Sequence, residues 1–125
     1  MANEQEAKLL AAVQAASRKW MAAFNAGDAA GCAANYEEDA VMVAKPFGKF
    51  TGRGEIEAFW DKIIGDGFAD VEYLEPEITV VDETSAVLSS KWRMNKAHGV
   101  ITKELWVVQD DGVALLREDA FEVLG

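Results

Sequence analysis

The sequence of 125 residues contains one cysteine and one histidine, and no apolar run in it approaches about 18 residues. No membrane-spanning helix is therefore expected. A single cysteine, Cys32, cannot form an intrachain disulfide, which fits a reducing cytoplasm. His98 has no partner at metal-ligand spacing, so no metal site is expected. The sequence also lacks a phosphate loop, a dinucleotide fingerprint and a nucleophile elbow, so no cofactor is predicted.

Basic residues are scarce as well. The chain has 12 Lys and Arg residues against 22 Asp and Glu residues, a formal net charge of −10. Such a field repels polyanions, so neither nucleic acid nor an anionic membrane is an expected partner. The N-terminus lacks the basic and apolar regions of a secretory signal, which again predicts a cytoplasmic protein.

The length of the chain and its pattern of apolar residues predict a single domain over residues 1–125. Asn3 is placed to cap a helix whose apolar residues recur every three or four positions, and Gly27 should end it. Asp28 is placed to cap a short second helix that reaches about Asn35. The segments expected next are a strand over 40–44, a loop over 45–54 and a third helix over 53–64.

From residue 68 onward, apolar and polar residues alternate with a period of two, which predicts strands. These strands span 68–81, 85–95, 100–109 and 113–124. Pro76 predicts an edge strand or a bulge, and Asp111-Gly112 predicts a hairpin turn. Because twisted sheets with bulges curl, we expect an α+β fold: a curved, mostly antiparallel sheet wrapped around the long N-terminal helix. This cone would enclose one pocket.

A set of residues spread along nearly the whole chain gives this pattern a family likeness: Trp20, Ala23, Asn25, Gly27, Asp28, Tyr36, Asp39, Ala40, Gly52, Ile56, Phe59, and the Asp111-Gly112 hairpin before Arg117 and Asp119. With them the sequence resembles the nuclear transport factor 2-like superfamily, whose fold is the cystatin-like cone. Within that superfamily it is similar to small ketosteroid-isomerase-like and polyketide-cyclase-like bacterial proteins. The resemblance implies a pocket for a small molecule, used for catalysis in some members and not in others.

The resemblance to ketosteroid isomerases breaks down at the functional positions. Their oxyanion-hole tyrosine falls on Trp20, their general-base aspartate falls on Ala44, and their protonated aspartic acid falls near Glu104. An alanine cannot accept a proton, so steroid isomerisation is not predicted.

Two acidic residues on the last two predicted strands are the candidate catalytic pair. A two-residue turn would place Glu104 opposite Asp119. It would also place Trp106 opposite Arg117. A three-residue loop would instead place Lys103 opposite Asp119. In the first register, two half-buried carboxyl side chains with Cβ atoms about 5 Å apart would share a proton near neutral pH.

We interpret Glu104, Asp119 and Arg117 as catalytic residues, with the carboxyl pair acting as acid and base and Arg117 tuning it. A structural alternative is that a buried Arg117 forms a salt bridge with both carboxylates as an internal strut, which would also shift their pKa values.

Aromatic residues are the main candidates for binding a flat, apolar ligand. Trp92 and Trp106 each share a strand face with a polar residue, Ser90 or Glu104. Burial in an apolar core would leave these polar side chains without partners, so both tryptophans are expected to line the pocket. Trp60, on the apolar stripe of the third helix, is predicted to fill the core outside the sheet. The predicted ligand-binding residues are Trp20, Met42, Phe59, Ser90, Trp92 and Trp106.

Two functional hypotheses follow. The first is a cofactor-independent isomerase, cyclase or dehydratase acting on a small, mostly apolar carbonyl or hydroxyl compound. The second is a binding or association module that uses the same pocket without turnover. On either hypothesis, large apolar residues on the outer face predict a homodimer formed through the sheet. The residues expected on that face are Val87, Ile101, Leu105, Val107 and Leu116.

Overall fold

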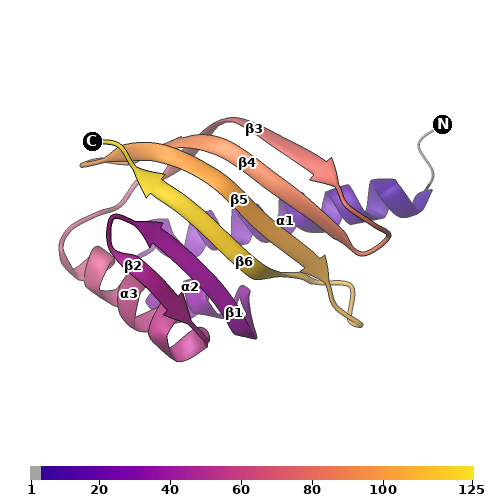
Figure 1. The fold of residues 1–125 in the computed structure, drawn as a ribbon, viewed down its shortest axis with the longest axis horizontal. Helices are drawn as coiled ribbons and strands as arrows, with labels where there is room; N and C mark the ends of the chain where they lie inside the picture. The colour runs from indigo at the N-terminus through magenta and orange to yellow at the C-terminus, as the bar shows by residue number, and fades with distance from the viewer. Residues whose placement is uncertain (1–3) are drawn as a thin grey trace.

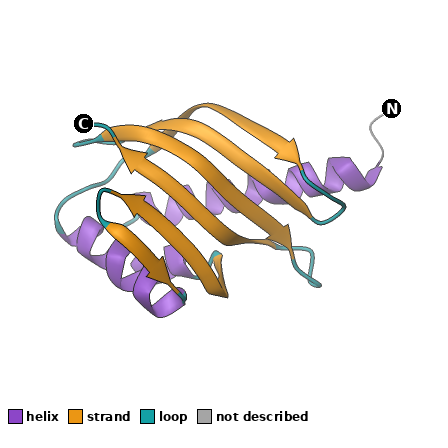
Figure 2. Ribbon diagram, in the orientation of Figure 1, coloured by secondary structure: helices purple, strands orange, loops and turns teal. Residues whose placement is uncertain are grey.

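A computed structural model of the protein describes residues 4–125, which form a six-stranded sheet with three helices on one side of it (Figures 1 and 2). In chain order the elements are α1 (Glu4–Asn25), α2 (Ala29–Ala33), β1 (Tyr36–Lys45), β2 (Gly48–Thr51), α3 (Arg53–Gly65), β3 (Glu72–Val80), β4 (Ser85–Arg93), β5 (His98–Val108) and β6 (Ala114–Val123). None of the described helices combines the length and the apolar character needed to cross a bilayer.

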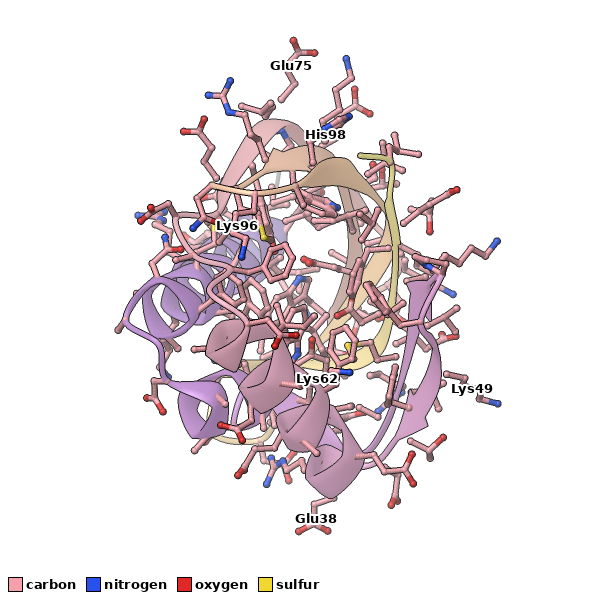
Figure 3. The ribbon with its side chains drawn as sticks, turned by 90° about the vertical axis from the view of Figure 1, so that its left-hand side faces the viewer. Glu38, Lys49, Lys62, Glu75, Lys96 and His98 are labelled. Atoms are coloured by element: carbon pink, nitrogen blue, oxygen red, sulfur yellow. The ribbon has the colours of Figure 1, made fainter. Side chains whose placement is uncertain are left out.

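The strands lie in the order β2-β1-β6-β5-β4-β3, and every neighbouring pair is antiparallel except β1 and β6, which run parallel. Figure 3 shows the sheet arching over the helices. The core fills the space under this arch, with Phe24 of α1, Ile56 of α3 and Trp106 of β5 all at most 1% exposed. The predicted α+β cone is confirmed.

The corner between the first two helices forms as predicted. Gly27 has a φ of +76°, and the next N–H, that of Asp28, donates to the Ala23 carbonyl (2.8 Å), which closes the end of α1. The Asp28 carboxylate then accepts a hydrogen bond from the Gly31 N–H (2.9 Å) and caps α2. The predicted Asn3 cap lies outside the described residues.

The loop predicted over 45–54 is wrong, because this segment forms a hairpin. Strand β2 pairs with β1, and Phe50 lies opposite Met42. The Phe50 ring also packs on Phe59 of α3 at 4.7 Å between centroids, so a tertiary contact stabilises a strand whose local sequence is rich in glycine. At the other edge of the sheet the prediction for Pro76 is confirmed, since β3 is an edge strand with a bulge there.

The last hairpin closes with the three-residue loop 110–112, across which the Gln109 N–H donates to the Val113 carbonyl (2.9 Å). By sequence reasoning alone, this loop length places Lys103 opposite Asp119. The observed partner of Asp119 is nevertheless Glu104.

A bulge in β6 explains this pairing. Strand β6 has one extra residue at Arg117, between the pairs Trp106–Leu116 and Leu105–Glu118. The extra residue shifts the register by one position. Glu104 therefore lies opposite Asp119, as the first predicted register requires, while the predicted pairing of Trp106 with Arg117 is wrong.

A second bulge lies on the other side of the pair. Strand β5 has one extra residue at Thr102, so Ile101 and Glu104 both face the core although they are three positions apart. The bulge in β6 similarly turns Leu116 inward, where it is 1% exposed. Ile101 and Leu116 therefore do not belong to the outer apolar face on which the sequence placed them.

The packing of Gly99 on β5 gives a test of the sheet. A methyl group at Gly99 would overlap the Glu122 carbonyl oxygen and lie 2.6 Å from the Trp92 ring. We expect Gly99→Ala to lower the free energy of unfolding by about 1–3 kcal/mol, measured by urea denaturation. Gly54→Ala, where a methyl group meets open space, serves as the control. Equal unfolding midpoints for the two variants would contradict this packing.

Candidate functional site

A cavity of about 180 Å³ lies between the concave face of the sheet and the helices α1 and α3. Its wall is mostly apolar and includes the aromatic side chains of Trp20, Phe59, Trp60, Phe68, Trp92 and Phe121. The acidic residues in the wall are Glu104 and Asp119, and the basic residue is Lys96. Figure 3 looks at the end of the molecule where Lys96 lies.

Glu104 and Asp119 are cross-strand partners and are only 4% and 5% exposed. Both carboxylate oxygens of Glu104 accept hydrogen bonds, one from the Tyr73 hydroxyl (3.0 Å) and one from Trp106 Nε1 (3.0 Å). Asp119 Oδ2 accepts a hydrogen bond from the Tyr36 hydroxyl (2.6 Å). Asp119 Oδ1 is buried and has no partner within residues 4–125. The pair thus keeps one oxygen without a donor.

The Tyr36 hydroxyl is held in place from several sides. Trp60 Nε1 donates to it (3.3 Å), and Met42 Sδ lies 3.7 Å away. Arg53 Nε donates to the Tyr36 carbonyl (2.6 Å) and fixes the backbone at the start of β1. Because the hydroxyl accepts from Trp60 and donates to Asp119, the three side chains form one directed chain of hydrogen bonds.

Burial raises the pKa values of both carboxyl groups. Burial, followed by the charge of Asp119, raises the pKa of Glu104 to about 8, against the hydrogen bonds from Trp106 and Tyr73. Burial raises the pKa of Asp119 to about 7, against the hydrogen bond from Tyr36. Since the two groups interact, these values describe successive proton losses from the pair. The pair therefore holds at least one proton near pH 7.

Arg117 lies outside this site, which corrects the sequence prediction. As the extra residue of β6 it points away from the core, and its guanidinium pairs with Glu37 of β1 through Nε (2.7 Å) and a terminal nitrogen (3.1 Å). The predicted tuning role and the alternative internal strut are therefore both wrong. With no arginine beside it, the carboxyl pair keeps the full effect of burial on its pKa values.

Three of the predicted ligand-binding residues, Trp20, Phe59 and Trp92, line the cavity. Trp60 lines it too, although the sequence assigned this residue to core outside the sheet. Helix α3 packs under the arch of the sheet, where the Trp60 ring stacks on Phe121 at 5.6 Å. The apolar stripe of α3 therefore faces the cavity.

The other three predicted residues are not in the cavity wall. Met42 is fully buried behind Tyr36, and the Ser90 hydroxyl donates to the Leu74 carbonyl (3.1 Å). Trp106 is 1% exposed and reaches the site through its hydrogen bond to Glu104. These residues support the wall from behind.

Sequence reasoning missed the two tyrosines as site residues. Tyr36 comes four residues before the strand that was predicted to begin at residue 40, so its side chain was not assigned to the sheet face. Tyr73 lies opposite Trp92 in the pairing of β3 with β4, and that cross-strand position is the signal that could have found it.

The comparisons with known proteins agree with this architecture. The family profile described as a SnoaL-like domain matches residues 17–117. The chain belongs to the SnoaL-like family. This finding, with the structural neighbours below, confirms the resemblance to the nuclear transport factor 2-like superfamily. No curated protein sequence gives a significant match.

Several solved structures share the fold of this SnoaL-like domain. A ketosteroid isomerase-like protein from Erwinia carotovora atroseptica SCRI1043 superposes with a TM-score of 0.80 at 18% identity, covering 99% of each chain. A putative scytalone dehydratase from Novosphingobium aromaticivorans DSM 12444 gives 0.80 at 18% identity, covering 98% of this chain and 88% of the other. ActVI-ORFA from Streptomyces coelicolor gives 0.76 at 18% identity, covering 92% and 97%. At this identity the likeness establishes the fold alone.

The ionisable side chains of this SnoaL-like domain differ in the chemistry that they offer. Ala44, at the position of the isomerase base, is fully buried and pairs with Phe121 on β6, so no carboxylate stands there. Across residues 4–125, no three His, Cys, Asp or Glu side chains are grouped to hold a metal ion. Burial raises the pKa of the Cys32 thiol to about 12, which leaves it a packed, unreactive side chain. Glu104 and Asp119 remain as groups able to exchange protons in the cavity.

The raised pKa values predict how stability depends on pH. From the ordinary carboxyl values of 3.8 and 4.5 up to about 7 and 8, the folded chain binds more protons than the unfolded chain. The free energy of unfolding should therefore fall as pH rises through this range, by up to about 1.4 kcal/mol per pH unit for each retained proton. Urea denaturation at a series of pH values measures the slope.

Glu104→Gln should flatten this slope, whereas the matched change Glu57→Gln at an exposed site of α3 should leave it at the wild-type value. Carbon-13 NMR of the side-chain carboxyl groups gives an independent reading. The shared proton would be refuted if Glu104 and Asp119 both titrated at about pH 4.

Proposed function

We propose that this SnoaL-like domain is a cofactor-independent acid–base catalyst of the isomerase, cyclase or dehydratase type. Its substrate would be a small, mostly apolar compound with a carbonyl or hydroxyl group. The observation that carries the proposal is the state of the Glu104–Asp119 pair, which is buried in the cavity wall, retains at least one proton near neutral pH and keeps one oxygen, Asp119 Oδ1, without a partner. Such a pair can both donate and accept a proton.

The hydrogen bonds give the two carboxyl groups different roles in the proposed proton transfer. Two donors, Tyr73 and Trp106, point at the two oxygens of Glu104, and donors of this kind favour the ionised form. Asp119 receives one donor, from Tyr36, and its Oδ1 is the natural position for the shared proton. Asp119 Oδ1 would exchange the proton with the substrate, and Glu104 would share the proton of the pair with Asp119.

Two indole N–H groups of the cavity wall lack an acceptor, which supports a substrate that carries a polar oxygen. Trp20 Nε1 and Trp92 Nε1 are buried and have no acceptor in the described part of the chain. A buried donor without a partner costs free energy, about 1–3 kcal/mol each. A carbonyl or hydroxyl oxygen in the cavity would reduce that cost. The names of the structural neighbours, among them a putative scytalone dehydratase and a ketosteroid isomerase-like protein, support the same class of reaction.

The test of this function is Asp119→Asn. Ketones of one and two rings, such as cyclohex-2-enone and 2-tetralone, serve as probes, and proton NMR in D₂O measures the exchange of their α-hydrogens. We expect the wild-type protein to accelerate exchange and the variant to lose about 10²- to 10⁴-fold of that rate, because the acid–base group is gone. Affinity, measured from tryptophan fluorescence, should stay within a few-fold of wild type.

Glu118→Gln is the matched control, since Glu118 adjoins Asp119 but pairs outward with Lys103 (3.1 Å). Acid–base catalysis would be ruled out if Asp119→Asn exchanged as fast as Glu118→Gln.

A second candidate is a binding module without turnover, favoured by the missing carboxylate at Ala44. On that hypothesis the probes bind with unchanged exchange rates, and Asp119→Asn alters affinity alone.

We also propose that two copies associate through the outer face of the sheet. Apolar side chains of neighbouring strands meet on that face, where Val87 pairs with Leu105 and Val107 pairs with Leu115. Sedimentation should give about twice the chain mass of 13.6 kDa, and Leu105→Glu should convert the dimer to monomer by placing a charge in the contact. A wild-type protein that sediments as a monomer at micromolar concentration would contradict the dimer.

A further inference from the structure

Lys96 is the one basic residue among those that line the cavity in the described chain, and it lies in the turn between β4 and β5. We propose that the ligand is a small ring compound bearing a carboxylate, which binds Lys96 at the cavity mouth while the carbonyl or hydroxyl oxygen reaches Asp119. This assignment rests on the proposed function and adds the charge and the size of the substrate.

The Lys96 ammonium has unused capacity to bind an anion. Its Nζ donates to the Asp66 carbonyl (2.8 Å) and lies 5.0 Å from the centroid of the Phe68 ring. An ammonium group carries three donors, so the bond to Asp66 leaves two. None of the ion pairs formed within residues 4–125 involves Lys96. In a chain of net charge −10, this is a cation without a carboxylate partner beside an apolar cavity.

The surrounding backbone fixes the position of this cation. The Asn95 side chain donates to the Gly67 carbonyl (2.9 Å) and accepts from the Ala69 N–H (3.0 Å), which ties the β4–β5 turn to the loop before β3. Gly67, with a φ of +94°, gives Lys96 room, because a methyl group there would lie 3.2 Å from Nζ. The ammonium is therefore held at the rim by two joined loops.

The size of the cavity limits the ring system. A cavity of roughly 150 Å³ is enough for benzene, whereas pockets for drug-sized molecules span about 300–1,000 Å³. At about 180 Å³, this cavity fits one ring or a small fused pair. The aromatic wall formed by Trp60, Trp92 and Phe121 suits the faces of such a ring. A four-ring steroid exceeds the space.

The experiment compares acids with their neutral amides. Benzoate, phenylacetate and 3-phenylpropionate are each titrated against the corresponding primary amide, with quenching of tryptophan fluorescence as the readout because three tryptophans line the cavity. We expect at least one acid to bind the wild-type protein about tenfold or more tightly than its amide. Lys96→Met should abolish this preference with little change in amide affinity, and Lys96→Arg should retain part of it.

Lys62→Met is the matched control. Lys62 is exposed in the last turn of α3, at the same end of the molecule as Lys96 (Figure 3), and is not in the cavity wall. Both variants remove one positive charge, so a general electrostatic effect would change both equally. Unfolding midpoints equal to wild type would show that the loss of preference in Lys96→Met is local.

Three results would overturn the proposal: equal affinity of acids and amides for the wild-type protein, equal losses in Lys62→Met and Lys96→Met, or no saturable quenching by any of the acids up to millimolar concentration. Each can be told apart from failure of the proposed function. The anion preference is a property of binding at Lys96, whereas the exchange assay reports on Asp119.

Discussion

The burial of two carboxyl groups side by side is the constraint on which this structure depends. Removing an ionised carboxylate from water is costly unless donors or a cation replace the lost hydration. Here Tyr73 and Trp106 supply donors to Glu104, and Tyr36 supplies one to Asp119. Because the two carboxyl groups are adjacent and shielded from water, the remaining way to lower the free-energy cost of their burial is to keep a proton on the pair. The pair is therefore poised to release and recover a proton near neutral pH.

The two bulges explain how a regular hairpin comes to hold this pair. Thr102 in β5 and Arg117 in β6 are extra residues on either side of it, and each turns residues three positions apart toward the same face. The bulge at Arg117 also directs this guanidinium to Glu37 on the outside. A cation beside the pair would favour the ionised carboxylates and lower their pKa values. The bulge at Arg117 thus sets the register of the acidic pair and also keeps the Arg117 guanidinium away from the site.

The sequence predicts the parts of this structure that depend on local signals. The Gly27-Asp28 corner, the strand alternation and the bulge near Pro76 are each encoded within a few residues, and all are found. Strand β2 could not be predicted because its stability comes from Phe50 packing on a distant helix. The bulges at Thr102 and Arg117 carry no glycine or proline to announce them. Because these bulges could not be predicted, the sequence identifies the two acidic residues of the pair but not the side chains that surround them.

The chemistry of the pair supports the proposed proton transfer over simple binding. A pair of amide side chains at the positions of Glu104 and Asp119 could offer carbonyl oxygens to Trp106 and Tyr36, with the Tyr73 hydroxyl turned to accept from the amide N–H, and could contact a ligand without a titrating charge. The carboxyl pair instead costs stability at neutral and higher pH, since both pKa values are raised by burial. What carboxyl groups add over amides is a proton that can be given up and taken back. That property has value in the cavity when a ligand must gain or lose a proton there.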